Sequence, residues 1–134
     1  MALVDTSVAI ALTVADHTER EATVAVVAGR TLGLAGHAAF ETFSVLTRLP
    51  VPNRATAAAA GRALSRNFPE TRYLGADAAA KLLASLPSLG LGGGAVYDAL
   101  VGAAAREHNL LLITRDRRAA TTYRALDVHY EIVA

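Results

Sequence analysis

Short apolar segments alternate with longer helical segments along this chain, and this alternation constrains its fold more than any other feature. Five short runs have the character of strands, at residues 2–4, 31–35, 71–74, 110–114 and 128–133. Between them, helices are predicted at residues 7–14, 18–29, 37–49, 54–68, 76–86, 95–108 and 117–126. Strands that alternate with helices usually pair in parallel. The pattern predicts an α/β fold with a largely parallel central sheet of four to five strands and helices on both faces.

Several local signals set the expected helix boundaries. Thr18 and Glu21 have the spacing of a capping box, so a helix is expected to begin there. Asp77 is expected near the N-terminal cap of the helix at residues 76–86, and Pro87 is expected to end that helix. The chain shows no internal repeat and no linker. We therefore expect a single domain over residues 1–134.

Composition narrows the classes of protein to consider. The chain has no Cys, so disulfide frameworks and thiolate chemistry are excluded. The N-terminal residues lack the basic region of a signal peptide, and no apolar run reaches the length of a membrane span, so a cytoplasmic location is expected. Charged residues make up only 19% of the chain, below the usual quarter, and this deficit suggests a buried self-association face. We expect a homodimer.

Four acidic residues stand in apolar surroundings. Asp5, Glu41 and Asp98 are each the only charged residue of a long segment. Asp116 lies shortly after the apolar run at residues 110–113, beside Arg115. An isolated carboxylate in an apolar segment is costly unless a partner compensates its charge. Four such residues, spread over the whole chain, indicate one shared partner. A hard divalent cation is the simplest partner for several carboxylates.

The predicted fold brings these acids together. Asp5 directly follows the first strand, and Asp116 follows the strand at residues 110–114 by two residues. Glu41 and Asp98 lie near the N-terminal ends of apolar helices. In a parallel sheet with helices on both faces, strand C-termini and helix N-termini meet at the same edge. The sequence therefore predicts one cleft that contains all four carboxylates.

Four ordered segments contain the four acids: Leu3-Val4-Asp5-Thr6-Ser7, the run from Phe40 to Arg48, Tyr97-Asp98-Ala99-Leu100, and Thr114-Arg115-Asp116. Together they resemble the PIN domain family, and within it the VapC-type toxins of bacterial toxin–antitoxin pairs. The resemblance covers essentially the whole chain. It implies a ribonuclease that depends on Mg²⁺ or Mn²⁺ and is inhibited by a cognate antitoxin protein. It assigns the catalytic and metal-binding roles to Asp5, Glu41, Asp98 and Asp116, and supporting hydroxyl roles to Thr6 or Ser7 and to Thr114.

The residue chemistry agrees with such a function. Hydrolysis of a phosphodiester needs an activated water and neutralisation of the developing negative charge, and metal ions do both. The net charge is only +1, so RNA must be attracted by a local basic patch. Arg115, Arg117 and Arg118 flank Asp116 and are the candidates for RNA binding.

Structural roles remain open for the same residues. Asp5 and Asp116 each precede a predicted helix and are suitable N-terminal caps. Glu41 is alternatively a satisfied polar group within a packed helix, and Asp98 alternatively caps a helix start or pairs with an Arg there. The arginines after Thr114 are alternatively a solvated face. Tyr97 and Phe43 are expected in the core. The four His have no metal-ligand spacing and are expected to be structural or exposed: His17, His37, His108 and His129.

Two other functions compete with the nuclease. The segment from Gly90 to Ala95 fits a loose dinucleotide-binding pattern, with Asp116 as the ribose-binding acid, but it does not directly follow a predicted strand. A phosphoacceptor domain would use Asp5 as its nucleophile. One class of such sites requires a second Asp where this chain has Ser7, and another requires a late Lys, whereas the only Lys is Lys81.

Overall fold

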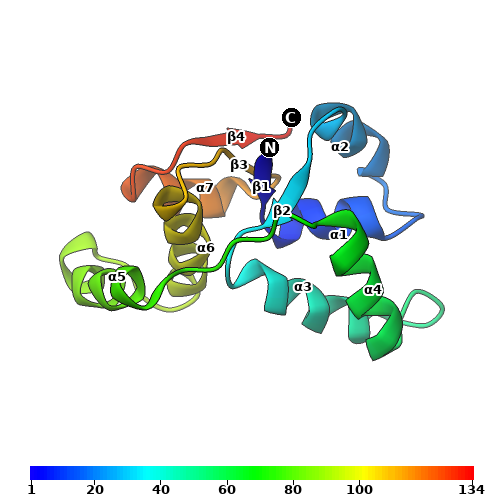
Figure 1. Ribbon diagram of the computed structural model, residues 1–134, viewed down its shortest axis with the longest axis horizontal. Coiled ribbons are helices and arrows are strands. Elements are labelled where there is room, and N and C mark those ends of the chain that lie inside the picture. The colour runs from blue at the N-terminus through cyan, green and yellow to red at the C-terminus, as the bar shows by residue number, and fades with distance from the viewer.

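Four short parallel strands form the centre of the computed structural model, which describes residues 1–134 (Figure 1). The strands are β1 (Ala2–Val4), β2 (Leu32–Leu34), β3 (Leu112–Thr114) and β4 (Tyr130–Ile132). The helices are α1 (Thr6–Thr13), α2 (Arg20–Val27), α3 (Ala38–Thr47), α4 (Ala57–Asn67), α5 (Ala76–Leu89), α6 (Ala95–Glu107) and α7 (Arg117–Ala125). None of the seven helices has the length and apolar character needed to span a membrane.

The strand order places β1 between the strands that follow it. The order is β2-β1-β3-β4, and every neighbouring pair is parallel. From β1 the chain passes first to β2 on one side, and later to β3 and β4 on the other. The order therefore reverses between β1 and β3, and binding sites of open parallel sheets form at this reversal. The predicted α/β fold with a parallel sheet is confirmed.

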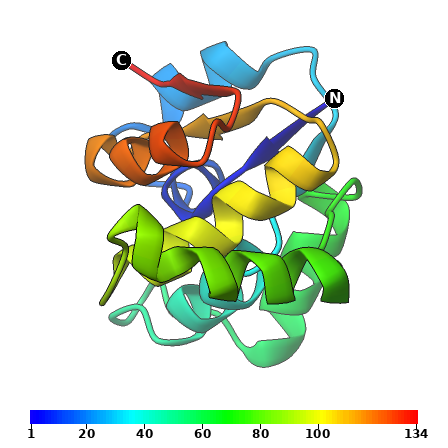
Figure 2. The same ribbon diagram turned by 90° about the vertical axis from the view of Figure 1, so that its left-hand side faces the viewer.

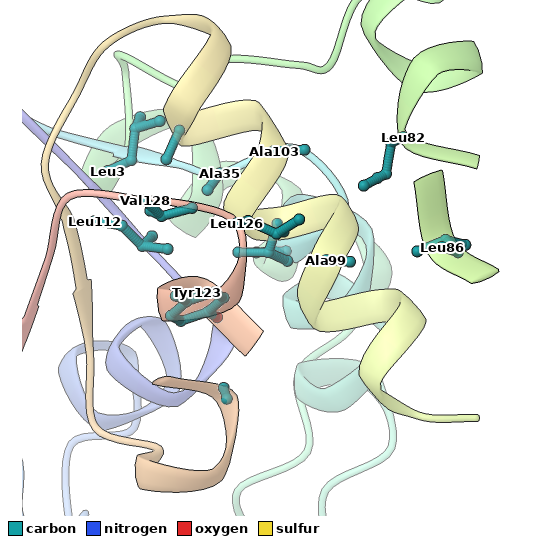
Figure 3. Packing of buried hydrophobic residues seen from close by; sticks show 14 residues of the cluster. Leu3, Ala35, Leu82, Leu86, Ala99, Ala103, Leu112, Tyr123, Leu126 and Val128 are labelled. Carbon is teal, nitrogen blue, oxygen red and sulfur yellow. The ribbon is translucent and has the colours of Figure 1, made fainter. Parts of the chain in front are cut away.

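The two faces of the sheet build two separate cores. Leu3 of β1 and Leu112 of β3 belong to a cluster with side chains of α5, α6 and α7 (Figure 3). Their neighbours Val4 and Ile113 belong to a second cluster, formed with residues of α1, α2 and α3. Because successive side chains of a strand point to opposite faces, both faces are buried. The arrangement explains why the central strand β1 is apolar at every position.

Small residues let α6 approach its neighbouring helices closely. Ala99 and Ala103 lie on the side of α6 that faces Leu82 and Leu86 of α5 in Figure 3. At Gly102 a side-chain Cβ would lie only 3.0 Å from the ring of Tyr123 in α7. On its outer side, α6 is covered by α5, which forms the outermost layer in Figures 1 and 2. Close packing of this kind places the first turn of α6 beside the sheet edge.

The predicted strand at residues 71–74 is wrong, because only Arg72 forms an isolated bridge there, with Ala35. The segment does run beside β2. However, the backbone N–H of Leu34 donates to the Thr71 hydroxyl at 3.0 Å, so a side chain replaces the next backbone partner. The approach is possible because Gly33 has no side chain, since a Cβ there would lie 2.1 Å from the carbonyl oxygen of Glu70.

Two expected helix signals are also wrong, and a third is displaced. Thr18 does not cap α2, because the backbone N–H of Glu19 donates to His17 Nδ1 at 3.1 Å and the helix begins at Arg20. Asp77 lies in the first turn of α5 rather than at its cap. Pro87 does not end α5. A proline in the last turn removes few helix hydrogen bonds, and the helix continues to Leu89 before Gly90 ends it with a positive φ of 68°.

Candidate active site

Asp5 occupies the reversal point of the sheet, directly after β1, and is 5% exposed. Its Oδ1 accepts hydrogen bonds from Ser7 Oγ at 2.5 Å and from the backbone N–H of Val8 at 3.3 Å. Its Oδ2 accepts from Thr114 Oγ1 at 2.5 Å and from the Tyr123 hydroxyl at 2.9 Å. The bond to Val8 caps α1, so the expected capping role is present. Four donors from three elements hold this carboxylate in one orientation.

The hydroxyls that donate to Asp5 also connect the C-terminal ends of β1 and β3. Ser7 Oγ accepts a hydrogen bond from the backbone N–H of Arg115 at 2.8 Å. Thr114 Oγ1 accepts from the backbone N–H of Asp116 at 3.0 Å. Thr6 has a different partner, because its hydroxyl accepts from Thr42 Oγ1 of α3 at 3.4 Å. Ser7 and Thr114 therefore support Asp5 directly, whereas Thr6 connects α1 to α3.

All four acids line one small cleft of about 40 Å³, at the carboxyl edge of the sheet. The other lining residues are Thr6, Ser7, Val101, Ala119 and Tyr123. Asp116 caps α7, with Oδ1 accepting from the backbone N–H groups of Arg118 at 2.9 Å and Ala119 at 3.3 Å. Glu41 and Asp98 lie in the first turns of α3 and α6, and their carboxylates make no hydrogen bond. The cleft thus combines fixed and unconstrained carboxylates.

The electrostatics of the cleft are those of crowded negative charges. Burial, and then the nearby charges of Asp116, Asp5 and Glu41, raise the pKa of Asp98 to about 6, against the opposing charge of Arg118. Burial also raises the pKa of Asp5, although hydrogen bonds from its hydroxyl neighbours oppose this effect. The charges of the three other acids thus act together on Asp98.

The donor set suits a hard divalent cation in charge and in ligand type. Mg²⁺ and Mn²⁺ prefer oxygen ligands, and the cleft offers carboxylates and hydroxyls but no nitrogen or sulfur. No three His, Asp or Glu side chains are arranged in this structure as ligands of one ion. The unpaired carboxylates of Glu41 and Asp98 are the ones without a hydrogen-bonded orientation. The ligand types and charge of the cleft therefore suit a divalent cation. The side chains of Glu41 and Asp98 would adjust to complete its coordination.

A comparison with protein families gives a match to the PIN domain model over residues 2–125. The chain belongs to the PIN domain family. The matched region begins at β1 and ends in the last turn of α7, so it contains every residue of the acidic cleft. The family resemblance noted in the sequence is thereby confirmed.

Curated relatives extend the match over nearly the whole chain. The chain is 47% identical over 131 residues to Ribonuclease VapC27 of Mycobacterium tuberculosis strain H37Rv, covering 98% of this chain and 96% of the relative. It is 43% identical to Ribonuclease VapC40 of the same species, covering 96% of each protein. Among solved structures, the protein PAE2754 of Pyrobaculum aerophilum matches with a TM-score of 0.57 and 22% identity, over 92% of this chain and 86% of that one. This last likeness concerns the fold alone.

The three arginines near Asp116 lie at the rim of the PIN-domain cleft rather than in its lining. Arg115 Nη2 lies 3.8 Å from Glu19 Oε2, and Arg118 Nε lies 3.9 Å from Asp116 Oδ1. Arg117 is exposed and forms no ion pair. Arg118 is almost fully exposed, so its side chain is free to bind another group.

Sequence reasoning missed Tyr123, which is 1% exposed and donates to Asp5. Burial, and then the charge of Asp5, raise the pKa of this hydroxyl well above its ordinary range, so it remains a donor. A signal was present, because Tyr123 follows Asp116 by two helical turns and lies on the face that carries Ala119 and Ala120.

Other expectations fare differently in the structure. Tyr97 is wrongly expected in the core, since it is 52% exposed, whereas Phe43 is half-buried. The glycine-rich segment from Gly90 follows α5 instead of a strand, so it lacks the placement of a dinucleotide-binding loop.

Proposed function

We propose that this protein is a ribonuclease that hydrolyses phosphodiester bonds of RNA with the help of Mg²⁺ or Mn²⁺, and that it is the toxin of a toxin–antitoxin pair. The observation that carries the proposal is the convergence of Asp5, Glu41, Asp98 and Asp116 on one polar cleft. The names of the VapC relatives, which match over almost their full length, support the same activity and the toxin role.

The four carboxylates are the proposed catalytic and metal-binding residues. A bound divalent cation supplies an activated water and neutralises the charge that develops on the phosphate. Asp5 is the fixed member of the set, because hydroxyls of Ser7, Thr114 and Tyr123 hold both its oxygens. Glu41 and Asp98 are the adjustable members, because no hydrogen bond restrains their carboxylates. Asp116 keeps Oδ2 available while Oδ1 caps α7.

The cleft is negatively charged and repels RNA phosphates, so nearby cationic side chains must attract the RNA. Arg117 and Arg118 are exposed beside it, and Arg115 lies nearby in an ion pair with Glu19. We assign to these side chains the binding of the RNA backbone on either side of the cleft. Such contacts release counterions from the RNA backbone. This release is less favourable at higher salt concentration, so binding should weaken as ionic strength rises.

The same acidic cleft is the proposed target of the antitoxin. An Arg guanidinium can form two hydrogen bonds with a carboxylate, and it would replace the cation among the four acids. We further propose that the protein acts in the cytoplasm as a homodimer, since the low charge content is consistent with a buried self-association face.

Cleavage of purified RNA tests the activity. The wild type should cleave with Mg²⁺ or Mn²⁺ and stop when a chelator is added. Asp98→Asn should lose cleavage by orders of magnitude, whereas Asp77→Asn, which removes an exposed charge from α5, should retain it. Equal cleavage by the wild type and Asp98→Asn, at matched purity and metal concentration, would refute the proposal.

A further inference from the structure

Three of the seven Phe and Tyr side chains are more than half exposed, and two of them directly precede acids of the cleft in sequence. The chain has four Tyr and three Phe. Phe40 is 66% exposed, Tyr73 55% and Tyr97 52%. Burying an aromatic ring favours folding, and this protein loses half or more of that gain at each of these three positions. Folding stability therefore does not account for the placement of these rings.

These rings form two contacting pairs, and neighbouring positions on α3 join the pairs into one row. The rings of Tyr97 and His37 are stacked, with centroids 5.2 Å apart and planes inclined by 26°. The rings of Phe40 and Tyr73 are 6.2 Å apart at 53°. His37 and Phe40 are three residues apart at the start of α3, so they are neighbours on its surface. We call this set, His37, Phe40, Tyr73 and Tyr97, the aromatic row.

The aromatic row begins beside the two unconstrained carboxylates. Tyr97 directly precedes Asp98 in the first turn of α6. His37 lies one helical turn before Glu41, whose backbone N–H donates to the His37 carbonyl at 3.1 Å. The stacked pair of Tyr97 and His37 thus joins the same two helix N-termini that supply Asp98 and Glu41.

We propose that the aromatic row is a stacking platform for unpaired bases of single-stranded RNA next to the phosphate that is cleaved. This inference rests on the ribonuclease function proposed above. Proteins bind single-stranded RNA by stacking its bases on aromatic side chains while cationic groups hold the backbone. The row supplies uncharged ring faces, and the arginines near Asp116 supply the cations. Bases on the row would bring the adjoining phosphate to the carboxylates.

The row could alternatively bind protein, because an apolar groove of about 360 Å³ continues from it along Phe43 and Leu64. RNA is favoured by the near-parallel geometry of Tyr97 and His37 and by their attachment to the cleft residues. The substrate class that follows is RNA with unpaired bases, such as loops and single-stranded segments, because bases inside a duplex cannot reach the rings.

The test begins by mapping the cleavage position on a short single-stranded RNA with the wild type and Mg²⁺. Steady-state kinetics are then measured for Tyr97→Ala, Tyr97→Phe and Phe40→Ala, with Leu83→Ala as a control at an exposed apolar position on α5. Base stacking contributes about 1–3 kcal/mol, so Tyr97→Ala should raise KM roughly 5- to 150-fold with little change in kcat. Tyr97→Phe should restore KM, and Leu83→Ala should behave as the wild type.

Abasic nucleotides beside the cleavage position provide the decisive readout. They should lower kcat/KM of the wild type but cause no further loss in Tyr97→Ala, because the lost base has no ring left to stack on. Independent, additive losses would overturn the platform. So would an unchanged KM in Tyr97→Ala and Phe40→Ala accompanied by a changed molar mass in light scattering, which would assign the row to a protein contact. A wild type that cleaves no RNA would instead overturn the proposed function itself.

Discussion

Replacing Asp98 with Asn should stabilise the protein in the absence of metal. Asp98 is half-buried beside three other carboxylates, and its own carboxylate has no hydrogen-bond donor. Burial and these charges raise its pKa from 3.8 to about 6, so the folded state disfavours its ionised form. Asn has nearly the same shape and no charge. The substitution therefore removes a destabilising interaction and leaves the packing unchanged.

The size of the effect follows from the pKa of Asp98. One pKa unit corresponds to about 1.4 kcal/mol, so a rise from 3.8 to about 6 gives an upper bound of about 3 kcal/mol. Solvent screens a half-exposed group, and we expect about 1–2 kcal/mol. With an unfolding entropy of about 2.1 cal/mol/K per residue, this gain raises the melting temperature by roughly 4–7 °C.

The sign depends on pH in a defined way. Below the unfolded pKa of 3.8, Asp98 is protonated in both states and costs nothing. As the pH rises from there through about 6, the unfolded state loses the proton first and the wild type loses stability relative to Asp98→Asn. Above this window the difference is constant. The two melting temperatures should therefore coincide in acid and separate between pH 4 and pH 6.

Thermal unfolding with chelator, followed by circular dichroism across this pH range, measures the effect. Asp77→Asn is the matched control, because it removes the same charge from an exposed position in the first turn of α5. Loss of a favourable helix-dipole interaction should leave that variant unchanged or slightly destabilised. If Asp98→Asn melts below the wild type at neutral pH, the inference that ionised Asp98 destabilises the metal-free protein is wrong.

Substitutions at three further positions test contacts that support the site and the edge of the sheet. Tyr123→Phe removes a buried donor to Asp5 and should cost about 1–3 kcal/mol in thermal unfolding, and an unchanged melting temperature would contradict this. Asp116→Ala should lose about 1 kcal/mol of helix capping that Asp116→Asn retains, while both lose RNA cleavage; equal stability of the two would exclude the cap. Gly33→Ala places a Cβ against the carbonyl of Glu70 and should lower the free energy of unfolding in urea by roughly 1–3 kcal/mol, whereas an unshifted midpoint would disprove the close approach.

The fold was largely predictable because its local signals agree with its tertiary contacts. Apolar runs bounded by turn residues become the strands, and helices lie between them as expected. The error at residues 71–74 arises from a contact distant in sequence, the bond from Leu34 to the Thr71 hydroxyl. No pattern within the segment reveals that a side chain interrupts the ladder. The capping error at Thr18 has a similar cause, since His17 takes the backbone donor instead.

The candidate site was predictable in its acids and in the hydroxyls of Ser7 and Thr114, but not in its third support, Tyr123. Lone charges in apolar segments are visible in sequence, and the parallel sheet explains why Asp5 and Asp116 meet. Their catalytic and metal-binding roles stay predictions. Tyr123 was missed and Tyr97 was wrongly expected in the core, because residues of the same type are buried in one case and exposed in the other. Burial depends on neighbouring helices, so composition alone does not separate a ring that orients Asp5 from one that faces solvent.

Titration of the protein with Mn²⁺, followed by calorimetry, tests the central claim most directly, namely that the four carboxylates act together as one cation site. The account predicts saturable binding by the wild type and by Asp77→Asn. It predicts that Asp5→Asn and Asp98→Asn each weaken binding by more than roughly tenfold, since loss of even a supporting group commonly costs that much. Equal Mn²⁺ affinity in the wild type and in both cleft variants, or no binding by the wild type at millimolar Mn²⁺, would contradict it.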